Sequence, residues 1–187
     1  EDGVGPGPAE LAVDRGGGAA DGVGVTAADA AVGGGGGDLG VVGGAEAFRM
    51  FIKDELISEI NTRYRTENAK VIIGESLAGL FVTETFFIMP GLFDAYIAFD
   101  PSLWWNKQYL INQASAYLNN IQSKKIFWFA ASGEPSISEP TNQLADILKL
   151  NTLQNIIWHY SPEPNEKHST IFRAAKEKAL IWTLNKL

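Results

Sequence analysis

The 187-residue sequence contains no cysteine and only two histidines. Without cysteine there can be no disulfide, no thiolate nucleophile and no cysteine-ligated zinc. The histidines, His159 and His168, are nine residues apart in the sequence, which is a poor spacing for a metal site, so we expect neither a metal nor a cofactor. The lack of cysteine is compatible with either cytoplasm or periplasm, and no secretory signal is visible at the N-terminus.

Long apolar runs and basic clusters are missing as well. No apolar run approaches the ~18 residues that a membrane span needs, so we expect a soluble globular protein from Phe48 onward. The net charge of −7 comes from residues 1–47, which hold eight acidic residues and one basic residue, whereas the remaining 140 residues hold 14 of each. A neutral body without a Lys/Arg cluster argues against nucleic acid as a partner, because phosphate neutralisation dominates that affinity.

The first 47 residues have almost no side chains that could build a core. Sixteen of the 20 glycines lie there, and aromatic residues, isoleucine and lysine are absent. The composition favours a flexible tail. An alternative is that these letters do not represent the natural sequence and stand for N-terminal strands of the same domain. We therefore divide the chain into this segment, 1–47, and the C-terminal part of one catalytic domain, 48–187.

From Phe48 onward, helical and strand patterns alternate. The spacing of apolar residues predicts helices at 45–65, 76–89, 106–121, 142–150 and 169–187. Short apolar runs predict strands at 70–73, 95–99, 125–131 and 155–160. This alternation predicts an α/β fold in which helices cover both faces of a mostly parallel sheet, giving three layers.

Four polar residues each follow one of the predicted strands: Ser76, Asp100, Glu134 and His168. The carboxyl ends of parallel strands meet at one edge of a sheet, and ligands bind beyond that edge. We therefore expect these four side chains to lie close together.

A Gly-x-Ser-x-Ala-Gly turn, Gly74 to Gly79, joins the first predicted strand to the helix after it. A serine between small residues at a strand-to-helix turn is typical of the nucleophile elbow of α/β-hydrolases. The sharp turn requires small neighbours and directs backbone N–H groups, beginning with that of Leu77, toward a developing oxyanion. The alternative is a structural turn serine, Ser76, that caps the helix.

A serine nucleophile needs a base, and the two histidines differ in position. His159 lies inside a predicted strand, where a packed or edge position is expected. His168 lies in the loop after the last strand, where the hydrolase order of serine, acid and histidine places the base. The alternative for His168 is an exposed loop residue.

Three carboxylates are candidates for the acid that orients the histidine. Glu134 leads because it follows a strand through a Ser-Gly turn, the usual place for such a group. Asp100, at the end of the preceding strand, could substitute, and Glu166 could contact His168 locally. A Ser–His pair without a strong acid stays open.

Several further elements flank the serine turn in order. They are Phe51-Ile52-Lys53-Asp54-Glu55-Leu56, Pro90-Gly91-Leu92-Phe93-Asp94-Ala95-Tyr96, Asp100-Pro101-Ser102-Leu103-Trp104-Trp105 and Glu166-Lys167-His168. With these elements the chain from about Phe48 to Leu187 resembles the Putative esterase family of α/β-hydrolases, and is similar to bacterial predicted hydrolases close to the siderophore (enterobactin) esterases and related to the S-formylglutathione hydrolases.

The resemblance implies an α/β-hydrolase fold with Ser76 as nucleophile and His168 as base, and siderophore-esterase relatives can work with a Ser–His pair alone. Glu75, Trp104 and Trp105 are assigned to the substrate pocket; for Trp105 core packing is an equal alternative. Family members place several strands and a second oxyanion donor before the helix near Phe48. Here only the glycine-rich segment precedes that helix, so Leu77 is the one oxyanion donor that can be named.

The function expected from these residues is hydrolysis of a small-molecule carboxylic ester through an acyl-enzyme on Ser76. Siderophore lactones, acylated sugars and small thioesters all fit as substrates. A non-catalytic binding module and an acyltransferase that uses the same Ser–His pair are the alternatives. The sequence does not predict the oligomeric state.

Overall fold

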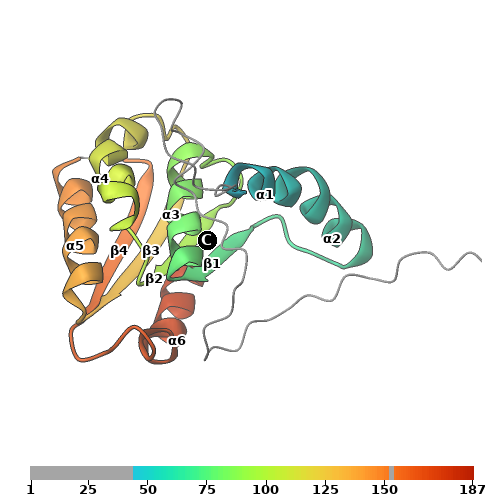
Figure 1. Cartoon of the computed structure of the whole chain (residues 1–187). Coiled ribbons are helices and arrows are strands. Elements are labelled where there is room, and N and C mark those ends of the chain that lie inside the picture. Colours follow the sequence, from blue (N-terminus) through green and yellow to red (C-terminus); the bar gives the residue numbers. More distant parts are fainter. Residues whose placement is uncertain (1–43, 152–153) are drawn as a thin grey trace, which may run out of the picture.

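A computed structural model describes residues 44–151 and 154–187, so the expectations for most of segment 1–47 lie outside the described residues. Its centre is a parallel sheet of four strands in the order β1-β2-β3-β4 (Figure 1). The strands are β1 (Val71–Glu75), β2 (Ala95–Phe99), β3 (Lys125–Ser132) and β4 (Ile156–Glu163). Each strand follows its predecessor in space as well as in sequence, so all four carboxyl ends meet at one edge.

Helices cover the sheet on both faces, as the sequence predicts. Figure 1 shows α3 (Leu77–Ile88), α4 (Trp105–Leu118) and α5 (Pro135–Leu150) over one face, and α6 (Ile171–Leu184) over the other. Alternate residues of β2 and β3 supply the two cores, since successive side chains in a strand point to opposite faces. Tyr96 and Phe127 belong to the larger core, and Ile97 and Trp128 pack with α6. None of the described helices is long and apolar enough to cross a membrane.

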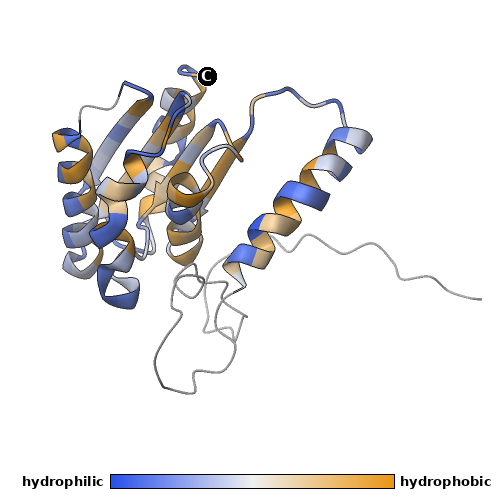
Figure 2. Ribbon diagram, turned by 90° about the horizontal axis from the view of Figure 1, so that it is seen from above, coloured by the Kyte–Doolittle hydropathy of each residue, from blue (hydrophilic) through white to orange (hydrophobic). Residues whose placement is uncertain are grey.

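A long helical segment stands beside β1 at the margin of the sheet. It consists of α1 (Ala45–Phe51), a π-helical turn η2 (Ile52–Leu56) and α2 (Ile57–Arg63). Figure 2 shows its far end diverging from the rest of the molecule. Buried Arg49 attaches α1 to α3 through an ion pair with Glu84 and a 3.1 Å hydrogen bond from its Nε to the Thr85 hydroxyl.

Most element boundaries differ by one to three residues from those predicted, and two of the differences involve proline. Helix α5 begins at Pro135 rather than at residue 142, because proline suits the first turn of a helix and Pro140 is accommodated inside it. Strand β4 continues through Pro162 to Glu163, beyond the predicted end at residue 160. A proline is tolerated there because β4 is an outer strand of the described sheet.

Candidate functional site

Ser76 occupies a sharp turn between β1 and α3. Its backbone angles, φ 60° and ψ −120°, lie in a region that favours glycine. The turn is closely packed on both sides: a Cβ added to Gly74 would lie 2.5 Å from the carbonyl oxygen of Ala78, and one added to Gly79 would lie 2.9 Å from that of Phe99. The small residues around Ser76 are therefore required by the geometry of the turn, as its spacing predicts.

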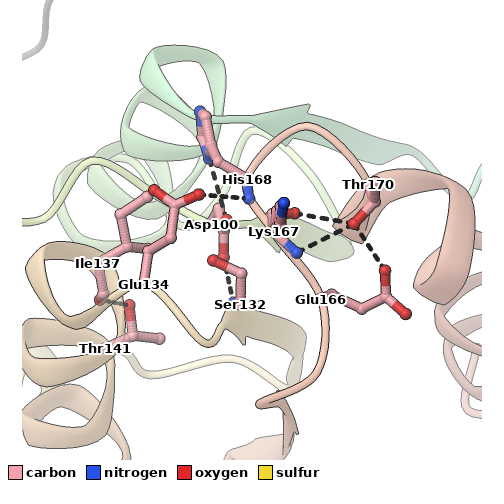
Figure 3. A network of polar contacts seen from close by, with 9 residues as sticks. All are labelled: Asp100, Ser132, Glu134, Ile137, Thr141, Glu166, Lys167, His168 and Thr170. Atoms are coloured by element: carbon pink, nitrogen blue, oxygen red, sulfur yellow. Dashed lines mark hydrogen bonds and ion pairs between the residues drawn. The ribbon is translucent and has the colours of Figure 1, made fainter.

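Asp100 follows β2, the strand next to β1, and its side chain contacts His168. The Asp100 side chain is fully buried, and its Oδ2 lies 2.9 Å from Nδ1 of His168 (Figure 3). Its other oxygen accepts a hydrogen bond from the backbone N–H of Ser132 at the end of β3. A buried carboxylate needs such partners, and here they hold Asp100 against one edge of the imidazole.

Glu134, the leading candidate for the acid, lies at the same edge but contacts a different part of the histidine. Its Oε1 accepts a 2.9 Å hydrogen bond from the backbone N–H of His168, whereas the ring is contacted by Asp100 (Figure 3). The carboxylate of Glu166 accepts a hydrogen bond from the Thr170 hydroxyl. Of the three candidate carboxylates, the one that contacts the ring nitrogen of His168 is that of Asp100.

Glu75, immediately before Ser76, lies close enough to His168 and Asp100 for their charges to act on its carboxyl group. Its side chain is partly buried, and this burial raises the pKa of its carboxyl group above the usual value. The charge of His168 acts in the opposite direction and that of Asp100 adds to the rise in pKa. Glu75 is thus a further polar group close to His168 and Asp100, and it directly precedes Ser76 in the sequence.

The two tryptophans assigned to the pocket differ in exposure. Trp104, just before α4, is 46% exposed, whereas Trp105 packs against the larger core. Their ring centroids are 5.6 Å apart. The segment that precedes them is attached to the serine turn, because the backbone N–H of Ser102 donates a 3.1 Å hydrogen bond to the carbonyl of Ser76. Leu77 is the first residue of α3, where a backbone N–H has no partner within the helix.

His159 lies inside β4, where the sequence predicts it. Its ring packs between Trp128 and Trp182, with centroids 6.4 and 5.3 Å away, on the face that α6 covers. Burial lowers its pKa, and the charge of Lys178 adds to this effect. Across residues 44–151 and 154–187, no group of three or more His, Asp and Glu residues is arranged to hold a metal ion.

Two contributors to the site are not apparent from the sequence. Ser132 and Gly133 act through backbone N–H groups, which bond to Asp100 and to the carbonyl oxygen of Glu166 respectively. A role of the backbone N–H does not depend on residue type, so the identities of these two residues do not indicate it. The Ser-Gly pair after a buried strand is the one feature that marks the turn.

Comparison with protein families identifies the same region of the chain. The model of the family described as Putative esterase matches residues 40–168. Ferri-bacillibactin esterase BesA of Bacillus subtilis is 28% identical over 152 residues, which are 76% of this chain and 53% of that protein. A siderophore triacetylfusarinine C esterase of Aspergillus fumigatus is 31% identical over 86 residues, which are 45% of this chain and 28% of that protein.

Solved structures share the fold. The BES protein of Bacillus cereus superimposes with a TM-score of 0.70 at 23% identity, covering 83% of this chain and 60% of that one. An IroE-like serine hydrolase of Shewanella oneidensis superimposes with a TM-score of 0.69 at 24% identity, covering 74% of this chain and 47% of that one. These likenesses identify the parallel sheet and its helices as an α/β-hydrolase fold, and the chain spans about half the length of the Bacillus subtilis relative.

Proposed function

Because this chain belongs to the Putative esterase family, we propose that it is a serine esterase that hydrolyses carboxylic esters through an acyl-enzyme on Ser76. The observation that supports this most directly is the 2.9 Å contact between His168 Nδ1 and the buried Asp100, at the edge of the sheet where Ser76 holds its strained turn. Strained backbone of this kind gathers at functional sites.

The chemistry proceeds in two steps. Asp100 accepts the Nδ1 proton of His168 in a hydrogen bond, which leaves Nε2 free to take the proton of the Ser76 hydroxyl. Ser76 then attacks the ester carbonyl, and the N–H of Leu77 stabilises the tetrahedral oxyanion. His168 returns the proton to the leaving alcohol, and water, activated by the same histidine, releases the acid.

The substrate class we propose is the ester bonds of a siderophore. The named relatives are esterases of bacillibactin and fusarinine siderophores. Glu75, Trp104 and Trp105 line the substrate side of the serine in this proposal. Trp104 offers an exposed aromatic face against which the acyl part of a siderophore can stack.

The proposal is tested with a fluorophosphonate probe, which reacts with an activated serine. The folded full chain should be labelled at Ser76, and Ser76→Ala should not be labelled. His168→Ala should lose labelling and hydrolysis of p-nitrophenyl esters and a siderophore trilactone, whereas His159→Ala should keep both. An unlabelled but folded wild-type chain would favour a binding module over an enzyme.

A further inference from the structure

His168 is held at two points by carboxylates from the ends of two different strands. Asp100 contacts its ring and Glu134 accepts a hydrogen bond from its backbone N–H, each at 2.9 Å. We propose that Glu134 is a positioning residue: it fixes the main chain of His168, the proposed base, while Asp100 orients the ring. This inference rests on the proposed function of Ser76 and His168.

The turn that carries Glu134 is locked against the loop that carries His168. The backbone N–H of Gly133 donates a 2.9 Å hydrogen bond to the carbonyl of Glu166. A Cβ added to Gly133 would lie 2.3 Å from the carbonyl oxygen of Pro164, so the two segments approach as closely as glycine allows. The backbone that precedes Glu134 therefore lies directly against the loop that carries His168.

The hydrogen bonds of Thr170 stabilise the shape of the loop but do not attach it to the β3–α5 turn. The Thr170 hydroxyl accepts from the backbone N–H of Lys167 and donates to Glu166, all within the loop (Figure 3). The bonds from the β3–α5 turn cross between segments. Of these, the Glu134 bond is the one that reaches His168 itself, at its backbone N–H.

A bond to a backbone N–H requires an acceptor oxygen and not a negative charge. Glutamine at position 134 keeps such an oxygen, whereas alanine removes it. An acid that stabilises the imidazolium by its charge would behave differently, because its amide variant loses the effect. The pair of variants Glu134→Gln and Glu134→Ala therefore separates positioning from a charge-dependent role.

The experiment measures ester hydrolysis and backbone amide exchange in wild type, Glu134→Ala and Glu134→Gln. We expect Glu134→Ala to lower kcat about 10- to 100-fold, with KM within about twofold, because small misplacements of a catalytic group cost this much. Glu134→Gln should restore kcat to within about threefold of wild type. Asp100→Asn, the comparison for a charge-dependent role, should lose about 10⁴-fold.

Amide hydrogen exchange at His168 gives a readout that does not depend on activity. It should be faster in Glu134→Ala and unchanged in Glu134→Gln. Equal losses of kcat in both variants, or unchanged exchange in Glu134→Ala, would overturn the positioning role. A wild-type chain that hydrolyses no ester would instead refute the proposed function, and the exchange rates would still report whether Glu134 holds the loop.

Discussion

Ser76 holds a backbone conformation that costs stability. Its φ of 60° and ψ of −120° are unfavourable for any residue with a Cβ, by about 1–3 kcal/mol. Ser76→Gly should therefore raise the free energy of unfolding by about 1 kcal/mol, partly offset by the greater flexibility of glycine in the unfolded chain, while removing all activity.

Ser76→Ala is the matched control for this prediction, because it removes the hydroxyl and leaves the strain. It should lose activity to the same extent as Ser76→Gly. Its free energy of unfolding, measured by urea denaturation, should equal that of wild type to within about 0.5 kcal/mol. If both variants unfolded alike, the turn would store no strain at Ser76.

The junction of β1 and α3 is a tightly packed element, and glycine at position 74 makes it possible. A Cβ there would meet both the carbonyl oxygen of Ala78, at 2.5 Å, and its carbonyl carbon, at 2.6 Å. These are backbone atoms of the first turn of α3, which cannot move without displacing the helix. Gly74→Ala should destabilise the protein by about 1–3 kcal/mol, as overpacking does, and should misplace Ser76.

Gly91→Ala supplies the control, because a Cβ at that position would meet nothing within 4 Å. Urea unfolding of Gly91→Ala should match wild type or show a gain of about 0.4–1 kcal/mol. Fluorophosphonate labelling should slow in Gly74→Ala alone. Equal stability of the two alanine variants would contradict the close packing of this junction.

At the scale of the whole molecule, the strands of the sheet can be predicted from the sequence, whereas the polar contacts at the edge of the sheet cannot. Strands β2 and β3 are continuous apolar runs because parallel strands are covered on both faces. The identity of the acid depends on strand order and on side-chain geometry, which local patterns do not contain. Asp100 ends the strand beside β1, whereas Glu134 follows the strand beyond it.

The start of α5 at Pro135 was also not predicted, because local patterns in the sequence do not show how the prolines are accommodated. Pro140 and Pro135 both interrupt a helical pattern in the sequence, but the first turn of a helix needs no N–H from Pro135, and tertiary packing buries Pro140 within α5. The proline-containing end of β4 likewise depends on its being an outer strand. For Pro140 and for the end of β4, a local signal is overruled by packing against residues that are distant in sequence.

The pH dependence of folding provides a test of the packing between α1 and α3. Burial raises the pKa of Glu84 from 4.5 to about 7, against the opposing charge and hydrogen bond of Arg49. The folded state then binds the proton more tightly than the unfolded chain, so the stability from this group is complete below pH 4.5 and is lost as the pH rises through about 7. The difference in unfolding free energy between wild type and Glu84→Gln should therefore shrink over this interval.

His159→Gln offers a comparison of opposite sign in the same urea titrations. Burial lowers the pKa of His159 below 6.5, so the folded state disfavours its protonation and stability is lost as the pH falls below that value. The difference in unfolding free energy between wild type and His159→Gln should thus grow as the pH rises, whereas the difference between wild type and Glu84→Gln should shrink. If the Glu84 difference also grew with pH, the carboxylate would be ionised in the folded state, and its pairing with Arg49 would outweigh the cost of burying both charges.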